Sequence, residues 1–252
     1  MSHHIIEIKD LEYTYPDQTK AVKGLSLRIL HGESVAIVGA NGAGKSTLLS
    51  HLIGVLIPSA GTVRIGDYPL NKETLTHIRR SVGMVFQNPD DQLFMPTVFD
   101  DVAFGPLNMG LPPKETEERV MAALTTVGAV HLKDRPPYKL SGGQKRSVAI
   151  ASVLSMLPDI LVMDEPSDGL DPYCRRQLIN LLKTFQHTKI IATHDLDLVV
   201  DLCERTVVLA DGKIIADGPT LQIFTDDALL QTSHLERPLR MQGCPICNPK
   251  AD

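Results

Sequence analysis

Two glycine-rich segments carry the clearest chemical signal of this sequence. Residues 39–47 read GANGAGKST, and residues 140–144 read LSGGQ. The first fits G-x-x-x-x-G-K-[ST], in which glycines let successive backbone N–H groups turn toward a polyphosphate at a helix N-terminus. This segment predicts a nucleoside triphosphate site. The second opens another helix and can bind anions by the same physics, so the two loops predict that two chains share each nucleotide.

A pair of carboxylates follows an apolar segment. Residues 160–163 are apolar and run into Asp164 and Glu165, and a buried strand here would place both carboxylates at the carboxyl edge of a sheet, where ligands of such folds bind. In the first loop, Lys45 is expected to reach the β- and γ-phosphates and Ser46 to bind Mg²⁺. Asp164 then fits a second Mg²⁺ ligand and Glu165 the residue that polarises the attacking water. The expected cofactors are ATP and Mg²⁺, and the predicted phosphate-binding residues are Gly39, Asn41, Gly42, Ala43, Gly44, Lys45, Ser46 and Thr47.

Alternating strand and helix patterns must position these residues. Ser34 to Val38 form a predicted buried strand that leads into the glycine loop, and a helix over 45–53 follows. Asp211-Gly212 predicts a hairpin turn. The alternation is typical of an α/β nucleotide-binding domain. Further strands are predicted at 5–9, 25–29, 160–163, 189–192, 206–210 and 213–216.

The middle of the chain differs from both flanks. From about residue 87 to 137 it contains many prolines, with a charged helix predicted near 114–127. This region predicts a helical subdomain inserted into the nucleotide fold. We therefore expect a nucleotide-binding domain over 1–225, which includes a helical subdomain at about 87–157 with the second motif. A C-terminal extension and tail follow over 226–252.

Composition narrows the class of protein. The 252 residues are 43% hydrophobic with a formal net charge of −5, so the chain can bury a large core and has no basic field for nucleic acid or anionic lipid. The longest weakly polar stretch, 147–163, contains serines, Pro158 and Asp159 and cannot supply the ~20 apolar residues of a membrane span. The N-terminus lacks a signal-peptide pattern. Four cysteines favour a reducing cytoplasm over a disulfide scaffold.

At the paired motifs the chain resembles the ATP-binding subunits of ABC transporters, over about residues 5 to 225. The resemblance implies a P-loop nucleotide-binding domain with a mixed sheet core, and ATP hydrolysis coupled to transport. It implies a homodimer at the cytoplasmic face of the membrane, with two identical composite sites. ATP closes such a dimer and hydrolysis opens it. The residues that cover the γ-phosphate bound by the opposite chain would be Ser141, Gly142, Gly143 and Gln144.

Four further positions match the family's motifs. Gln87, in VFQNPDDQ, matches the glutamine loop that reaches Mg²⁺ and the attacking water. His194, in IIATHDL, matches the switch histidine that contacts the γ-phosphate. Asp171, in SDGLDP, matches the aspartate loop between paired subunits, although a helix N-cap is an equally good interpretation. Tyr15, in YTYPD, matches the aromatic residue that stacks on adenine, with Tyr13 as the neighbouring alternative.

The segment Gln87 to Leu111 resembles ATPases of energy-coupling factor importers, particularly those for cobalt and nickel. Vitamin importers of the same class are the alternative. The resemblance implies a transmembrane coupling subunit and a substrate-binding membrane subunit as partners. Apolar and acidic residues here predict a groove for a basic helix, and a local core of the helical subdomain is the competing interpretation. These residues are Leu93, Phe94, Met95, Phe99, Asp90, Asp91, Asp100 and Asp101.

Other classes fit less well. A soluble ABC ATPase of DNA repair would need a coiled coil between the motifs, and no sustained heptads are present between Thr47 and Leu140. The translation type carries two cassettes in one chain. An interaction protein that only binds ATP would not need Glu165 and His194.

The C-terminal tail contains Cys244 and Cys247, which resemble half of a zinc knuckle. Two chains could supply four thiolates to a shared zinc ion, with His234 as an alternative ligand. A loose end with free thiols is the competing interpretation.

Overall fold

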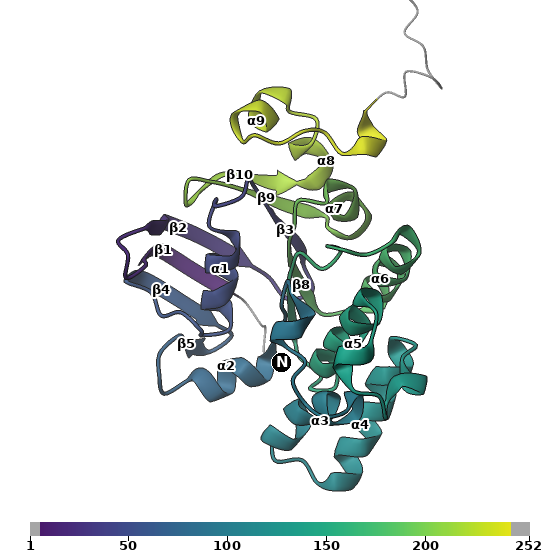
Figure 1. Ribbon diagram of the computed structural model, residues 1–252. Helices are drawn as coiled ribbons and strands as arrows, with labels where there is room; N and C mark the ends of the chain where they lie inside the picture. Colours follow the sequence, from purple (N-terminus) through teal and green to yellow (C-terminus); the bar gives the residue numbers. More distant parts are fainter. Residues whose placement is uncertain (1–5, 243–252) are drawn as a thin grey trace, which may run out of the picture.

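The computed structural model describes residues 6–242 (Figure 1). Its central six-stranded sheet has the strand order β10-β9-β3-β8-β7-β6. Neighbouring strands are parallel from β9 to β6, and β10 is antiparallel to β9. The sheet is therefore mixed, as expected. Its strands are β3 (Ser34–Val38), β6 (Val82–Val85), β7 (Ile160–Asp164), β8 (Thr188–Ala192), β9 (Arg205–Ala210) and β10 (Lys213–Pro219).

A second, antiparallel sheet packs beside the first with the order β2-β1-β4-β5. Helix α1 (Lys45–Leu52) buries Leu48, Leu49 and Leu52 in the core between the two sheets. Residues 6–9 and 25–29 of the predicted strands are parts of longer strands, and β4 and β5 are additions to the predicted set. The strands of this sheet are β1 (Ile6–Thr14), β2 (Lys20–Ile29), β4 (Ala60–Ile65) and β5 (Tyr68–Pro69).

Two separate cores share the six-stranded sheet as a common wall. In β3, Val35 and Ile37 face the core with α1, whereas Ala36 and Val38 face the helices on the other side. The same alternation continues along β7. Ile160 and Val162 lie in the core with α1, whereas Leu161 and Met163 lie in the core on the other side of the sheet. Because both faces are buried, these strands are continuously apolar, which made them recognisable in the sequence.

The helices fall on both sides of this wall (Figure 1). The predicted helix near 114–127 is confirmed as α4, which packs with α3 and α5. Among residues 6–242, no helix combines the length and apolar character needed to cross a bilayer. The other helices are α2 (Leu75–Ser81), α3 (Val98–Asn108), α4 (Pro113–Thr126), α5 (Gly142–Leu154), α6 (Pro172–Thr184), α7 (Leu196–Leu202), α8 (Thr220–Ile223) and α9 (Asp227–Thr232), with short 3-10 turns η1 (Pro89–Asp91), η2 (Val130–Leu132), η3 (Pro137–Lys139) and η4 (Leu239–Met241).

The predicted hairpin at Asp211-Gly212 is confirmed. Lys213 pairs with Ala210, and the two turn residues have φ of 46° and 75°. Positive φ at both central positions defines the turn that matches the twist of antiparallel strands. The backbone N–H of Gly212 donates to Ala43 O at 3.2 Å, so the hairpin also supports the glycine loop.

Candidate nucleotide-binding site

A cavity of about 720 Å³ lies at the carboxyl edge of the central sheet. The segments that line it follow β3, β6, β7 and β8, as expected for a ligand site in such a fold. Most of the predicted site residues meet here. They are Tyr15, Gly39, Asn41, Gly42, Gly44, Lys45, Ser46, Thr47, Gln87, Asp164, Glu165 and His194. Ala43 is buried behind the loop and is not among the lining residues.

The glycine loop is held in a conformation that only glycine tolerates. Gly39 and Gly44 have φ of 153° and 103°, and a side chain at either would collide with the backbone carbonyl of Leu209 or Ala21. Lys45 begins α1 and is 8% exposed. Its Nζ donates to Gly39 O at 2.8 Å and to Ala40 O at 3.2 Å, which arches the ammonium group over its own loop. A cation and a helix N-terminus therefore converge on the cavity, as polyphosphate binding requires.

The oxygen ligands present in the cavity fit Mg²⁺. Asp164 is 6% exposed at the end of β7, and burial raises its pKa above the ordinary value while a hydrogen bond with Ser46 opposes the rise. Residues 6–242 contain no cluster of three or more His, Cys, Asp or Glu residues suited to a metal. Mg²⁺ needs no such cluster, because it takes one or two carboxylates and completes its shell with water and phosphate oxygens. The hydroxyl of Ser46, the carboxylate of Asp164 and the amide oxygen of Gln87 are ligands of this kind.

Glu165 is fixed by the end of β8. Its Oε2 accepts hydrogen bonds from Thr193 Oγ1 at 2.9 Å and from the His194 N–H at 3.1 Å, and it lies 2.9 Å from His194 Nδ1. The backbone of Glu165 has φ of 45°, with its N–H bonded to Ala192 O at 2.8 Å. A left-handed glutamate persists only where its surroundings hold it. The His194 side chain is 67% exposed, so the imidazole extends from this anchored carboxylate toward solvent.

The loop around Gln87 joins the sheet to α5. The carbonyls of Phe86 and Gln87 accept hydrogen bonds from Arg146 at 2.7 and 2.6 Å. Arg146 is 4% exposed, and burial lowers its pKa. The Gln87 side chain also lies 3.4 Å from an Asp168 carboxylate oxygen. Sequence reasoning did not single out Arg146, Asp168 or Thr193, because their partners are distant in the chain. Asp168 and Thr193 stand within SDGLDP and IIATHDL, but those motifs indicated only Asp171 and His194 as site residues.

The LSGGQ segment is not brought to the cavity within one chain. Ser141 is the N-cap of α5: its hydroxyl accepts from Gln144 N at 3.3 Å, and Gln144 Oε1 accepts from Ser141 N at 3.0 Å. This reciprocal pair is a capping box. Ser141, Gly143 and Gln144 line a different cavity of about 600 Å³. Within one chain, the two glycine-rich segments therefore belong to separate sites.

Asp171 also acts as a helix cap. Its carboxylate accepts from the Cys174 N–H at 2.9 Å at the start of α6, which confirms the N-cap interpretation. It is not among the residues that line the nucleotide cavity. Any role between subunits would therefore be additional to this structural one.

Tyr15 and Tyr13 differ in position. Tyr15 lines the cavity, and its hydroxyl lies 3.1 Å from Thr47 Oγ1. Tyr13 packs against the core and meets the His51 ring edge-on at a centroid distance of 5.0 Å. Of the two tyrosines, Tyr15 is therefore the one that faces the cavity.

The predicted partner-binding segment mixes buried and exposed residues. Leu93 is 7% exposed and belongs to the core of the helical region, so its predicted place in a groove for a partner helix is wrong. Met95 and Phe99 are half-buried, whereas Phe94 is exposed. Among the acidic residues, Asp101 is buried and accepts the N–H groups of Phe94 and Met95, both at 3.0 Å. The local-core interpretation is therefore correct for part of this segment.

The other acidic residues differ in their surroundings. Asp90 pairs with Lys145, and Asp100 accepts from the hydroxyl of Thr97 at 2.6 Å. Asp91 is exposed at the end of η1. Within residues 6–242, the Asp91 carboxylate forms no ion pair or hydrogen bond, so it is the one of the four most available to a partner.

The C-terminal extension also reaches the cavity. His234 and Leu235 lie among its lining residues, although no sequence motif indicated this. Cys244 and Cys247, and with them the zinc hypothesis, lie outside the described residues.

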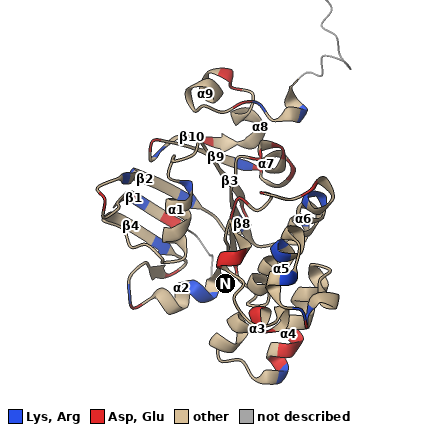
Figure 2. Ribbon diagram, viewed as in Figure 1, with Lys and Arg blue, Asp and Glu red and all other residues tan. Residues whose placement is uncertain are grey.

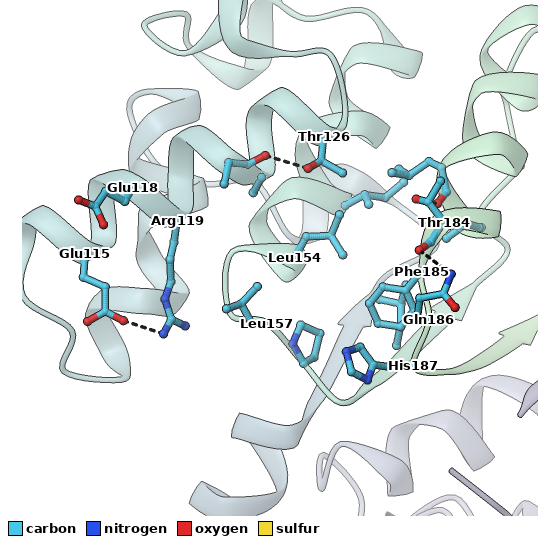
Figure 3. A pocket seen from close by; sticks show the side chains of 17 residues that line it. Glu115, Glu118, Arg119, Thr126, Leu154, Leu157, Thr184, Phe185, Gln186 and His187 are labelled. Carbon is cyan, nitrogen blue, oxygen red and sulfur yellow. Dashed lines mark hydrogen bonds and ion pairs between the residues drawn. The ribbon is translucent and has the colours of Figure 1, made fainter. Parts of the chain in front are cut away.

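A separate apolar groove of about 640 Å³ lies between α4, α5 and the segment after α6 (Figure 3). Glu115 and Arg119 form a 2.7 Å ion pair at one end, and Phe185 and His187 lie at the other, with Leu157 between them. None of the predicted nucleotide-site residues lines this groove. It is therefore distinct from the site of chemistry.

Comparison with known proteins agrees with this geometry. The family model described as ABC transporter matches residues 22–168. The chain belongs to the ABC transporter family. This cassette has the P-loop ATPase fold of its relatives, and it is an ATPase.

Two curated relatives cover nearly the whole chain. A Geobacter sulfurreducens protein, assigned provisionally as an ABC transporter ATP-binding protein, is 67% identical over 98% of this chain and 99% of its own length. The energy-coupling factor transporter ATP-binding protein EcfA of Methanocaldococcus jannaschii is 45% identical, with coverage of 98% and 90%.

Two solved structures are similar along most of the chain. The first is cbiO1 from Clostridium perfringens, described as part of the ABC transporter complex cbiONQ, with a TM-score of 0.80, 42% identity and coverage of 91% and 94%. The second is a dimeric ATP-binding cassette in a post-hydrolysis state with bound ADP and Pi, with a TM-score of 0.77, 29% identity and coverage of 85% and 98%.

Proposed function

We propose that this chain is the ATP-hydrolysing subunit of an energy-coupling factor importer and that cobalt or nickel ions are the cargo. The name of the Methanocaldococcus relative and the cbiONQ complex of the Clostridium relative support the importer class. The resemblance of the segment from Gln87 to Leu111 supports the metal cargo. In this proposal the chain sits at the cytoplasmic face of the membrane, bound to a transmembrane coupling subunit that associates with a substrate-binding membrane subunit.

The observation that carries the proposal is a fourth cavity, of about 590 Å³, beside this segment. Its lining includes Phe94, Phe104, Arg79 and Asp91, from α2, η1 and α3 and the turn between them. Phe94 and Phe104 are 63% and 42% exposed and meet edge to face at a centroid distance of 5.1 Å. An exposed aromatic pair beside a pocket is typical of a surface that receives an amphipathic helix.

Charge on the two sides of this cavity revises the expected partner. Figure 2 shows basic residues at the end of α2 and acidic residues in α3. Arg79 and Arg80 line the cavity from α2, and Asp91 lies in η1 opposite them. A helix with both signs of charge flanking an apolar stripe fits this surface better than the purely basic helix expected from the sequence.

In the proposed reaction, the glycine loop and Lys45 bind the phosphates of ATP, and Tyr15 packs against the base. Glu165, held by Thr193 and His194, accepts a hydrogen bond from the attacking water and polarises it. His194 reaches from that carboxylate toward the terminal phosphate. Mg²⁺, held by Ser46, Asp164 and Gln87, would neutralise charge on the β- and γ-phosphates.

A homodimer would complete the site. Ser141 to Gln144 lie outside the nucleotide cavity of their own chain, and the start of α5 is exposed at Ser141 and Gly142. A two-fold arrangement would place this helix N-terminus against the nucleotide of the opposite chain and so build two equal sites. The dimeric cassette with bound ADP and Pi supports this arrangement by similarity.

The test is affinity purification of the tagged chain from its native membranes, with identification of the proteins retained. We expect a polytopic coupling subunit and a small membrane protein, with cobalt or nickel uptake lost when the chain is deleted. Vitamin uptake lost instead would select the alternative cargo. Recovery of the tagged chain without any membrane protein would favour a soluble ABC ATPase and overturn the importer proposal.

A pair of variants tests the docking surface in the same experiment. Phe94→Ala with Asp91→Lys should release the membrane partner and leave ATPase activity of the free chain unchanged. Leu221→Ala is the matched control, because Leu221 is 60% exposed on α8, away from the fourth cavity. Equal retention of the partner by the double variant and the control would contradict this docking surface.

A further inference from the structure

The C-terminal extension is fastened to the helix that follows the switch histidine. The Arg240 guanidinium bonds Asp197 Oδ1 at 3.0 Å and Asp201 Oδ2 at 2.9 Å, and the Leu239 N–H donates to Asp197 Oδ2 at 3.0 Å. Both aspartates belong to α7, which starts directly after His194 and its neighbour. Arg240 lowers the pKa of Asp201, as expected for a carboxylate beside a guanidinium. The extension is thus anchored within reach of the catalytic edge.

A second anchor shapes the extension itself. Arg237 bonds both carboxylate oxygens of Asp227 at 2.7 Å, which closes residues 227–237 into a compact loop around α9. Leu230 is buried in the core, and Leu229 and Leu235 pack against it. Two bidentate ion pairs and an apolar contact therefore fix where the end of α9 lies.

The residue presented at that end has a rare conformation. His234 follows the C-cap of α9 with φ of 55°, while its N–H bonds Gln231 O at 3.2 Å and the Leu235 N–H bonds Leu230 O at 2.8 Å. Helices usually place glycine or asparagine at this left-handed position. Histidine here is exposed, and within residues 6–242 its imidazole makes no hydrogen bond. A strained residue with an unused donor points to a role outside the fold itself.

We propose that His234 contacts the phosphates of the bound nucleoside triphosphate, so that the C-terminal extension takes part in nucleotide binding. His234 and Leu235 line the same cavity as Lys45, Glu165 and His194. The anchor on α7 brings the extension to this cavity from the His194 side, where the terminal phosphate is expected. An imidazole N–H is a suitable donor to a phosphate oxygen. This inference rests on the proposed ATP site and adds a residue to it.

One consequence is coupling between nucleotide and extension. A contact between His234 and phosphate would hold residues 226–242 more firmly when triphosphate is bound than when the site is empty. Loss of the terminal phosphate would release part of this restraint. A protein that binds the extension would then meet a firmly held segment when triphosphate is bound and a looser one after hydrolysis.

The test compares His234→Asn with wild type by calorimetric titration of ADP and of the ATP analogue with a β,γ-imido bridge. Asparagine tolerates the left-handed backbone, so the fold and melting temperature should be unchanged. We expect affinity for the analogue to fall about three- to tenfold, as for loss of one phosphate hydrogen bond, and affinity for ADP to fall less. His187→Asn is the control, because His187 lies outside the nucleotide cavity.

Unchanged affinity of His234→Asn for both nucleotides would overturn the inference while leaving the ATP site intact. Failure of the wild-type chain to bind either nucleotide would instead overturn the proposed function. A second measurement follows hydrogen exchange in residues 226–242. Exchange should slow when the analogue binds to wild type, and not in His234→Asn; equal slowing in both proteins would contradict the contact.

Discussion

The two glycine-rich segments of this chain both lead into helices, but they differ in how the helix starts and in what surrounds it. At residues 39–47 the groups that could bind an anion face a cavity, with Lys45 arched over the loop and two buried carboxylates opposite. At residues 140–144 the polar groups satisfy each other in a capping box, and the segment lines a cavity of its own.

The difference indicates that the first segment binds the nucleotide within its own chain, whereas the second completes the nucleotide site of another chain. The first segment belongs to a site that one chain assembles by itself. The second is stable without a ligand, because Ser141 and Gln144 cap α5 internally. A helix start that is self-capped and partly exposed can meet a nucleotide on another chain with little rearrangement. This division between a site in one chain and its completion by a second can be tested by variants of each segment.

The largest effect is expected from Glu165→Gln, which disables the chemistry in the first region and leaves binding intact. Glutamine keeps the volume but removes the charge that polarises water, so turnover should fall about 100-fold or more. Steady-state hydrolysis measures the loss, and gel filtration with ATP should show a trapped dimer. A variant that hydrolyses ATP at the wild-type rate would remove Glu165 from its role.

Mixed dimers test whether the second region acts on the opposite chain. Lys45→Ala and Ser141→Arg homodimers should both be inactive, because every site carries one defect. In a mixed dimer both defects fall on the same nucleotide, which leaves the other site intact. Mixing should therefore restore ATP hydrolysis. Equal inactivity of pure and mixed samples at all ratios would argue against shared sites or for obligatory coupling between them.

The link between the two regions can be broken at Arg146. Replacing it by alanine leaves the carbonyls of Phe86 and Gln87 without their buried partner, so the free energy of unfolding should fall by about 2–3 kcal/mol. Arg119→Ala is the control, because its ion pair with Glu115 within α4 is worth about 0.5 kcal/mol or less. Denaturant titration measures both. Equal decreases in the free energy of unfolding of the two variants would show that the buried contacts of Arg146 contribute no more than a surface ion pair.

A smaller, pH-dependent effect is expected beneath the first region. His51 of α1 is fully buried, and its Nδ1–H donates to Thr47 O at 2.7 Å while Nε2 has no partner among the described residues. Burial lowers the pKa of His51 below its ordinary value near 6.5. The unfolded chain therefore binds a proton first as pH falls, and stability should be lost below about pH 6.5 by up to about 1.4 kcal/mol per pH unit.

His51→Leu removes the titrating group and should flatten this part of the profile. The measurement is the free energy of unfolding of both proteins between pH 7.5 and pH 5.5 in the same buffer series. The difference between them isolates His51 from the carboxylates that titrate at lower pH. Parallel profiles would contradict the assignment.

Sequence patterns predicted the elements that carry the chemistry. The strand before the glycine loop, the strand that ends at Asp164 and the strand before His194 were visible because each is a short apolar run buried on both faces. A hairpin with Asp-Gly and a helix rich in charged residues were equally clear. Local signals suffice for such elements.

Other features depend on contacts that no local signal encodes. The strand β6 contains Gly83, whose missing side chain leaves room for Val153 of α5 and weakens the strand pattern. Thr193 reaches Glu165 from the residue after β8, and Leu93 lies in a proline-containing segment but packs into the helical core. The role of His234 follows from two ion pairs that fold the extension back. Tertiary packing decides all of these.

The six-stranded sheet lies between the two cores, and this position determines what a deletion within one of its strands would do. Where both faces of a strand are buried and apolar, a slip by one residue exchanges the faces without exposing an apolar side chain. The alternation of apolar residues therefore does not fix the register of β7 by itself. The polar residue at its end, Asp164, does so, because it must face the cavity. Loss of one interior residue would draw that carboxylate back by about 3.3 Å while the strand remained apolar throughout. Such a deletion would withdraw Asp164 from the cavity and exchange the side chains that β7 contributes to the two cores, so it should cost both activity and stability.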